Sequence, residues 1–134
     1  GVFSQEVGAL AAILDTSGSI GAAQTAAFLR EARAMLDSGI VAELVLIACD
    51  ARAHLVGRFR KGDSIEVQSL PGGGGTDFAP PFELLEAEGI APTAAAYLTD
   101  LAGSFPAMPP AYPVLWIATE PGRAPFGTVV EMQP

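Results

Sequence analysis

Short, unbroken apolar runs alternate along the chain with segments whose apolar residues recur every three or four positions. A continuous apolar run of this length is typical of a strand that is covered on both faces of a sheet. We expect strands at residues 9–14, 44–49, 54–59, 93–98, 114–118 and 128–132, with a shorter one at 64–70. The second and third of these runs follow each other so closely that they predict a hairpin, which makes 54–59 an antiparallel edge strand.

Two segments have the apolar spacing of helices. In the first, the apolar positions are spaced i, i+4, i+7 and i+8: Phe28, Ala32, Met35 and Leu36. This spacing predicts a helix over 20–37, with Ser19 as its N-cap and Gly39 as its stop. In the second, the spacing is i, i+4 and i+7: Phe78, Phe82 and Leu85. It predicts a helix over 79–88, whose first turn tolerates two prolines. The segment 104–113 has four prolines and no helical period, so we expect a loop there.

This alternation of strands and helices implies an α/β fold. We expect a Rossmann-like three-layer sandwich with a mainly parallel sheet and an antiparallel edge strand. In such sheets, ligands bind outside the carboxyl ends of the strands. Asp15 and Asp100 stand at the ends of two predicted strands, so we expect both side chains at the same edge of the sheet.

The chain has 134 residues, half of them apolar, and a formal charge of −8. This length predicts a single domain over residues 1–134, and because the chain begins with Gly1 instead of Met we expect it to be part of a longer protein. Nucleic acids and anionic membranes both reward basic surfaces, so we expect neither as a partner. The single cysteine, Cys49, lies in an apolar run. We expect it to be a core residue, and the low cysteine count suits a reducing, cytoplasmic location.

Residues 15–19 read Asp-Thr-Ser-Gly-Ser at the end of the first predicted strand. Asp15, Ser17 and Ser19 carry oxygen donors at alternate positions, which in a tight turn can converge on a small hard cation such as Mg²⁺. Ser, Thr and Asp ahead of a helix are also common N-caps. Taken by itself, this segment fits a helix cap as well as a metal site.

A run of four glycines at 72–75 precedes Thr76 and Asp77. Glycines permit positive φ, so this loop can turn sharply and bring Thr76 to the same edge of the sheet. The alternatives are a turn in which Thr76 or Asp77 caps the next helix, and a phosphate-binding loop, which is disfavoured because no lysine follows the glycines. Asp100 by itself also suits an ordinary turn. The three segments together favour a cation site.

Taken together, these segments resemble the metal-ion-dependent adhesion site of von Willebrand factor A-type (VWA) domains, whose pattern is Asp-x-Ser-x-Ser, then Thr, then Asp. Asp15, Ser17 and Ser19 match the first element, while Thr76 and Asp100 match the other two. The resemblance implies Mg²⁺ or Mn²⁺ coordinated directly by the three hydroxyls. It implies that Asp15 and Asp100 act mostly through water, and that an Asp or Glu of a partner protein completes the shell.

The resemblance covers most of residues 6–118, and it includes three longer sequence segments. Gly-Gly-Gly-Gly-Thr-Asp-Phe (72–78), Tyr-Leu-Thr-Asp-Leu (97–101) and Pro-Val-Leu-Trp (113–116) are similar to bacterial VWA-like domains at the C-terminus of metallopeptidase-like proteins of unknown function. VWA domains commonly have more helices than this sequence predicts. The resemblance therefore implies a VWA-like fold with a reduced helix count.

No catalytic residue is expected within this chain. His54 is the only histidine and no His-Glu-x-x-His segment is present, so a zinc peptidase site would lack its ligands. Ser17 has neither a histidine base nor a Gly-x-Ser-x-Gly turn around it. We therefore expect a divalent-cation-dependent protein-binding module. The alternatives are an accessory domain of a metallopeptidase-like or other hydrolase, and a scaffold whose metal site is vestigial; the oligomeric state stays open.

Overall fold

The computed structural model describes residues 7–17, 19–66 and 77–132. These residues form the following elements in chain order: β1 (Val7–Asp15), α1 (Ala22–Asp37), β2 (Val41–Cys49), β3 (Ala53–Phe59), α2 (Pro80–Ala87), β4 (Ala94–Thr99), β5 (Val114–Ala118) and β6 (Thr128–Glu131). The strands make one sheet in the order β3-β2-β1-β4-β5-β6. Only the β2–β3 pair is antiparallel among the described strands. The predicted α/β class and the antiparallel edge strand are therefore confirmed.

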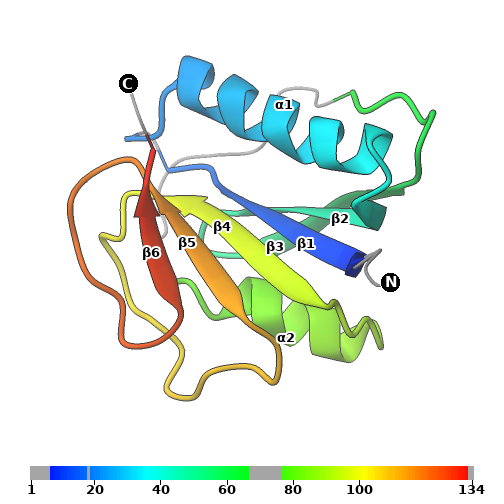
Figure 1. Cartoon of the computed structure of the whole chain (residues 1–134). Coiled ribbons are helices and arrows are strands. Elements are labelled where there is room, and N and C mark those ends of the chain that lie inside the picture. Colours follow the sequence, from blue (N-terminus) through cyan, green and yellow to red (C-terminus); the bar gives the residue numbers. More distant parts are fainter. Residues whose placement is uncertain (1–6, 18, 67–76, 133–134) are drawn as a thin grey trace.

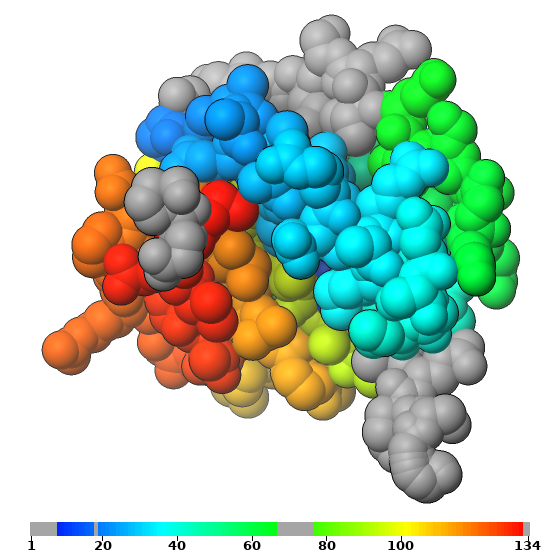
Figure 2. All heavy atoms as spheres, turned by 45° about the horizontal axis from the view of Figure 1, so that its top comes forward, coloured from blue at the N-terminus to red at the C-terminus, as the bar shows by residue number. Residues whose placement is uncertain are grey.

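The sheet has a hydrophobic core on each face, because successive side chains of a strand point to opposite sides. Figure 1 shows α1 over one face and α2 over the other. From β1, Leu10 and Leu14 pack with α1, while Ala11 and Ile13 belong to the core on the α2 side. Figure 2 shows α1 lying across one part of its face, with the surfaces of β5 and β6 beside it. In the described part of the chain no further helix covers these two strands there, which agrees with the predicted reduced helix count.

The predicted N-cap of the first helix is wrong. Helix α1 begins at Ala22 and its N-cap is Gly21, whose backbone N–H donates to Gln24 Oε1 at 3.0 Å. Ser19 lies two residues ahead of the cap. Glycine is a common N-cap residue and glutamine at the third helical position satisfies its N–H, so the helix begins two residues later than a cap at Ser19 would place it. The predicted stop is confirmed, since Gly39 follows the C-cap residue with φ of 83°.

The other predicted helices and strands lie within three residues of the observed boundaries, except for the predicted strand at 64–70, which is wrong over its described residues. Helix α2 starts with its two prolines in the first turn, as predicted. Residues 64–66 of the predicted strand at 64–70 are not in a strand, and its last four residues lie outside the described ranges. The segment 104–113 is a loop, and Ser104 in it forms an isolated parallel bridge with Asp77. Among the described residues, no helix has the length and apolarity that crossing a membrane requires.

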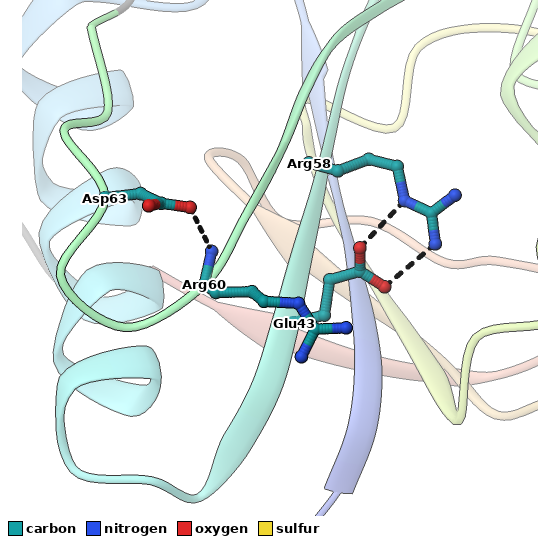
Figure 3. A network of polar contacts seen from close by, with 4 residues as sticks. All are labelled: Glu43, Arg58, Arg60 and Asp63. Carbon is teal, nitrogen blue, oxygen red and sulfur yellow. Dashed lines mark hydrogen bonds and ion pairs between the residues drawn. The ribbon is translucent and has the colours of Figure 1, made fainter.

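The edge strand β3 carries an ion pair with its neighbour β2. Arg58 donates from Nε and Nη2 to the two carboxylate oxygens of Glu43, at 2.8 and 2.9 Å (Figure 3). Just beyond the strand, the backbone N–H of Arg60 donates to Asp63 Oδ2 at 2.7 Å and tightens the turn. Charged side chains on an edge strand also discourage pairing with the edge of another sheet.

Replacing Glu43 by Gln tests this ion pair. The hydrogen bonds from Arg58 hold the pKa of Glu43 below its ordinary value of 4.5. A carboxyl whose pKa is lower in the folded chain stabilises the fold above its unfolded pKa and loses this effect as the pH falls through the folded pKa. We expect Glu43→Gln to lower the Tm by roughly 1–3 °C at pH 7, since Arg58 is half exposed. The difference should shrink below a pH of about 4.5. Thermal unfolding measures the Tm difference between the wild type and Glu43→Gln, with the exposed Glu120→Gln as control. If the difference caused by Glu43→Gln persists at pH 3, the stabilisation does not come from the Glu43–Arg58 ion pair.

Candidate metal centre

The sheet order places the candidate site at a topological switch point. From β1 the chain crosses to β2 on one side, whereas β4 pairs with β1 on the other side. Crevices of open α/β sheets form at such points, outside the carboxyl ends of the strands. Asp15 is the last residue of β1, and Asp100 directly follows β4. The two carboxylates that the sequence placed at one edge therefore come from neighbouring strands.

Asp15 is 6% exposed and held by two hydrogen bonds. Its Oδ1 accepts from the backbone N–H of Ser17 at 2.9 Å, and its Oδ2 accepts from the hydroxyl of Thr99 at 2.7 Å. The Thr99 hydroxyl in turn accepts from the backbone N–H of Leu101 at 3.1 Å. Each oxygen of Asp15 keeps lone pairs for a water or a cation. Asp15 is thus a buried carboxylate with a fixed orientation.

Sequence reasoning missed Thr99. The β1–β4 register ends at Leu14↔Leu98, so Asp15 and Thr99 are the next residues on the two neighbouring strands. Residues at matched positions of paired strands present their side chains to the same face of the sheet. The sequence does show a threonine immediately before Asp100 at the end of a buried strand. Assigning it to Asp15 requires knowing that β4 lies beside β1. Thr99 positions Asp15 and is itself fully buried.

Two serine hydroxyls connect the first segment to Asp100. Ser17 Oγ lies 3.2 Å from Ser19 Oγ, and Ser19 Oγ donates to Asp100 Oδ2 at 2.5 Å. The other oxygen of Asp100 accepts from the backbone N–H of Ala102 at 2.9 Å. Of the five residues predicted to form the site, the structure therefore brings four together: Asp15, Ser17, Ser19 and Asp100. Thr76 lies outside the described residues, as does the glycine run before it.

The turn after Asp100 has an unfavourable backbone conformation. Leu101 has φ of 66°, a region that residues other than glycine rarely adopt and that costs about 1–2 kcal/mol. In this conformation the N–H groups of Leu101 and Ala102 turn back to Thr99 and Asp100. Backbone strain of this kind concentrates at functional sites, where it holds side chains in place. The strained backbone at Leu101 therefore supports the choice of this edge of the sheet as the candidate site.

The donor set fits a small hard cation. Mg²⁺ prefers octahedral oxygen coordination at 2.0–2.1 Å, which places neighbouring ligand oxygens about 3.0 Å apart. The 3.2 Å between the hydroxyls of Ser17 and Ser19 is close to that separation. Among the described residues, no three of His, Cys, Asp and Glu gather at one point. A cation held here would therefore rely on hydroxyls and water as much as on carboxylates.

No basic side chain neutralises these carboxylates. All seven Lys and Arg residues and the one His of the chain lie within the described ranges. In those ranges, none of them forms an ion pair with Asp15 or Asp100. A buried charge is costly unless it is paired or coordinates a metal. The site therefore has an uncompensated negative charge to which a cation is attracted.

Two neighbouring residues have structural roles. Asp77 accepts from the backbone N–H of Ala79 at 3.0 Å, just ahead of α2, so one of its oxygens is engaged in the helix entry. Cys49 is buried, and its thiol donates to the backbone carbonyl of Asp50 at 3.2 Å. Burial raises the pKa of this thiol to about 11, so the thiolate nucleophile is scarce at neutral pH. Cys49 is a core residue, as predicted.

An open α/β sheet with oxygen donors gathered at its switch point defines the class of this domain, and the carboxyl edge is where ligands of such sheets generally bind. Within this class, the chain belongs to the VWA-like domain family (DUF2201), whose match covers residues 10–133. This membership confirms the predicted VWA-like fold. No curated protein and no solved structure matches the chain.

Proposed function

We propose that this domain binds a divalent cation, Mg²⁺ or Mn²⁺, and uses it to hold a carboxylate of a partner protein. Ser17, Ser19 and Thr76 would supply hydroxyl ligands, with Asp15 and Asp100 acting mostly through water. The bound ion would supply a positive charge with an open coordination position. VWA-like family membership supports a role in protein interaction or as an accessory module.

One observation carries the proposal. The hydroxyls of Ser17 and Ser19 are connected by hydrogen bonds to Asp100, and the backbone N–H of Ser17 donates to the buried carboxylate of Asp15. In the described residues no basic side chain forms an ion pair with either carboxylate. The direct ligands would be neutral hydroxyls, while the two carboxylates act through water, so no charged oxygen of this chain would contact the ion. An ion held in this way retains affinity for one more anionic oxygen, which is the reason to expect a carboxylate from outside the chain.

The proposal is tested by counting the water on bound Mn²⁺. Proton relaxation of water reports how many water molecules exchange on protein-bound Mn²⁺. We expect saturating Mn²⁺ to give an enhanced relaxation rate, and we expect added sodium acetate to lower it because acetate displaces a bound water. Sodium chloride at equal ionic strength is the matched control. Ser17→Ala should bind Mn²⁺ about 10–100 times more weakly, as the loss of a metal-site residue commonly costs.

Two results would count against the proposal. If Mn²⁺ shows no enhancement with the wild-type chain, no cation site exists. If Mn²⁺ binds but acetate and chloride have the same effect, the cation has a role other than gripping a carboxylate.

A further inference from the structure

A groove lies on the opposite face of the sheet from α1, between α2 and the proline-rich loop. Its volume is about 620 Å³. One wall is formed by α2 and the turn after it, through Phe82 and Ile90 among others. The facing wall is the loop from Pro106 to Tyr112. The groove exists because an irregular loop, and not a second helix, crosses this part of the sheet.

The lining of the groove is apolar, while its border is acidic. Phe82 and Tyr112 contribute aromatic rings whose centroids are 6.4 Å apart. Glu83 and Glu86 are exposed on the α2 side of the groove. No Lys, Arg or His is among the described residues that line it. Burial, with the charge of Glu86 as a lesser cause, raises the pKa of the Tyr112 phenol to about 12. The groove therefore combines an apolar floor with negative charge.

Met108 makes the loop wall adaptable. Its side chain is 76% exposed at the edge of the groove, the most exposed of the large apolar side chains in the described residues. Methionine is flexible and polarisable, and it recurs on surfaces that accept amphipathic peptides of varied sequence. An exposed methionine is poorly placed to stabilise the fold of this chain. It is well placed to cover an apolar side chain of a partner.

We propose that this groove docks an amphipathic segment of a partner protein, with apolar side chains between Phe82 and Met108 and lysines or arginines beside Glu83 and Glu86. Charge complementarity selects this partner, because the groove offers negative charge alone and the chain as a whole carries −8. The proposal is independent of the metal centre, since none of the groove residues belongs to the candidate cation site.

The test uses a phage-displayed library of random 12-residue peptides, selected on the full chain in EDTA. We expect enriched peptides that combine apolar residues with a net positive charge. Synthetic versions should bind at least about tenfold more weakly to Met108→Asn, because this change removes an apolar contact and places an unpaired amide beside the apolar floor without changing the charge. The matched control is Ile40→Asn, which alters another exposed apolar side chain, 50% exposed and outside the groove.

A pair of double variants separates local from global charge. Glu83→Gln/Glu86→Gln and Glu66→Gln/Glu120→Gln have equal net charge, and we expect only the first to weaken peptide binding several-fold. Enrichment of acidic peptides, no enrichment at all, or equal effects of Met108→Asn and Ile40→Asn would each overturn the groove proposal. Because EDTA is present throughout, none of these results bears on the cation site.

Discussion

Asp15→Ala is expected to remove most of the response of this domain to divalent cations. At a cation concentration 100 times Kd, binding to the folded state alone adds about 2.7 kcal/mol of stability, which raises the Tm by roughly 10 °C. Asp15 is the buried charge of the site, and its carboxylate is held by Ser17 and Thr99. Without it, we expect cation affinity to fall about 100-fold, which at the same cation concentration leaves about 0.4 kcal/mol and a Tm shift of roughly 1–2 °C. Differential scanning calorimetry in EDTA, Mg²⁺ and Mn²⁺ measures this shift.

Asp100→Asn is the matched comparison for Asp15→Ala. Its side-chain oxygen can still accept from Ala102, and its amide can still contact Ser19, so the turn keeps its hydrogen bonds. We expect its Tm in EDTA to equal or exceed that of the wild type, because one of two uncompensated charges is gone. The increase in Tm that Mg²⁺ or Mn²⁺ causes should be smaller for Asp100→Asn than for the wild type. Asp15→Ala should instead be less stable in EDTA by about 1–3 kcal/mol, since it leaves buried donors unsatisfied. If Mg²⁺ or Mn²⁺ raised the Tm of both variants as much as that of the wild type, Asp15 and Asp100 would not belong to a cation site.

Gly127→Ala is expected to cause the largest loss of stability among Gly→Ala changes at the glycines that the structure describes. Gly127 has φ of 77°, and a Cβ built there lies 2.5 Å from the backbone carbonyl oxygen of Val114 and 3.0 Å from Trp116 Nε1. Both contacts involve groups with little freedom to move, since Trp116 is fully buried and its indole N–H donates to the carbonyl of Phe126 at 2.9 Å. We expect a loss of about 2–4 kcal/mol in the free energy of unfolding.

Gly62→Ala is the control for this substitution. Gly62 has φ of 93°, but a Cβ there meets nothing within 4 Å, so only the backbone conformation is penalised. We expect its cost to be about 1 kcal/mol. Urea unfolding of both variants separates the two contributions, and equal losses would contradict the steric account of Gly127.

The sequence predicted most of the fold because the strands are short, buried and apolar throughout. The run at 114–118 matches β5, and the close spacing of β2 and β3 correctly indicated an antiparallel edge. The order of the other strands was beyond the sequence, because their hydrophobic patterns report burial and carry no information on which of these strands pair. The error at Ser19 has a local cause, since serine and glycine are both common N-cap residues and here they lie two positions apart.

The candidate site was predicted in part for a related reason. Asp15 and Asp100 could be placed at one edge because both end strands of a parallel sheet. Thr99 could not, because its role depends on the register between β1 and β4. The acidic groove depends on the path of the loop over residues 104–113, which has no periodic pattern to interpret.

The most direct measurement of the cation site is paramagnetic line broadening in the ¹H–¹⁵N NMR spectrum during a titration with Mn²⁺. The broadening depends steeply on distance from the ion. We predict that the amide signals of Ser17, Ser19 and residues 100–102 broaden first, at Mn²⁺ well below one equivalent, and recover in excess Mg²⁺. Broadening that begins at the exposed glutamates of α2, or that is uniform along the chain, would contradict a cation site at the ends of β1 and β4.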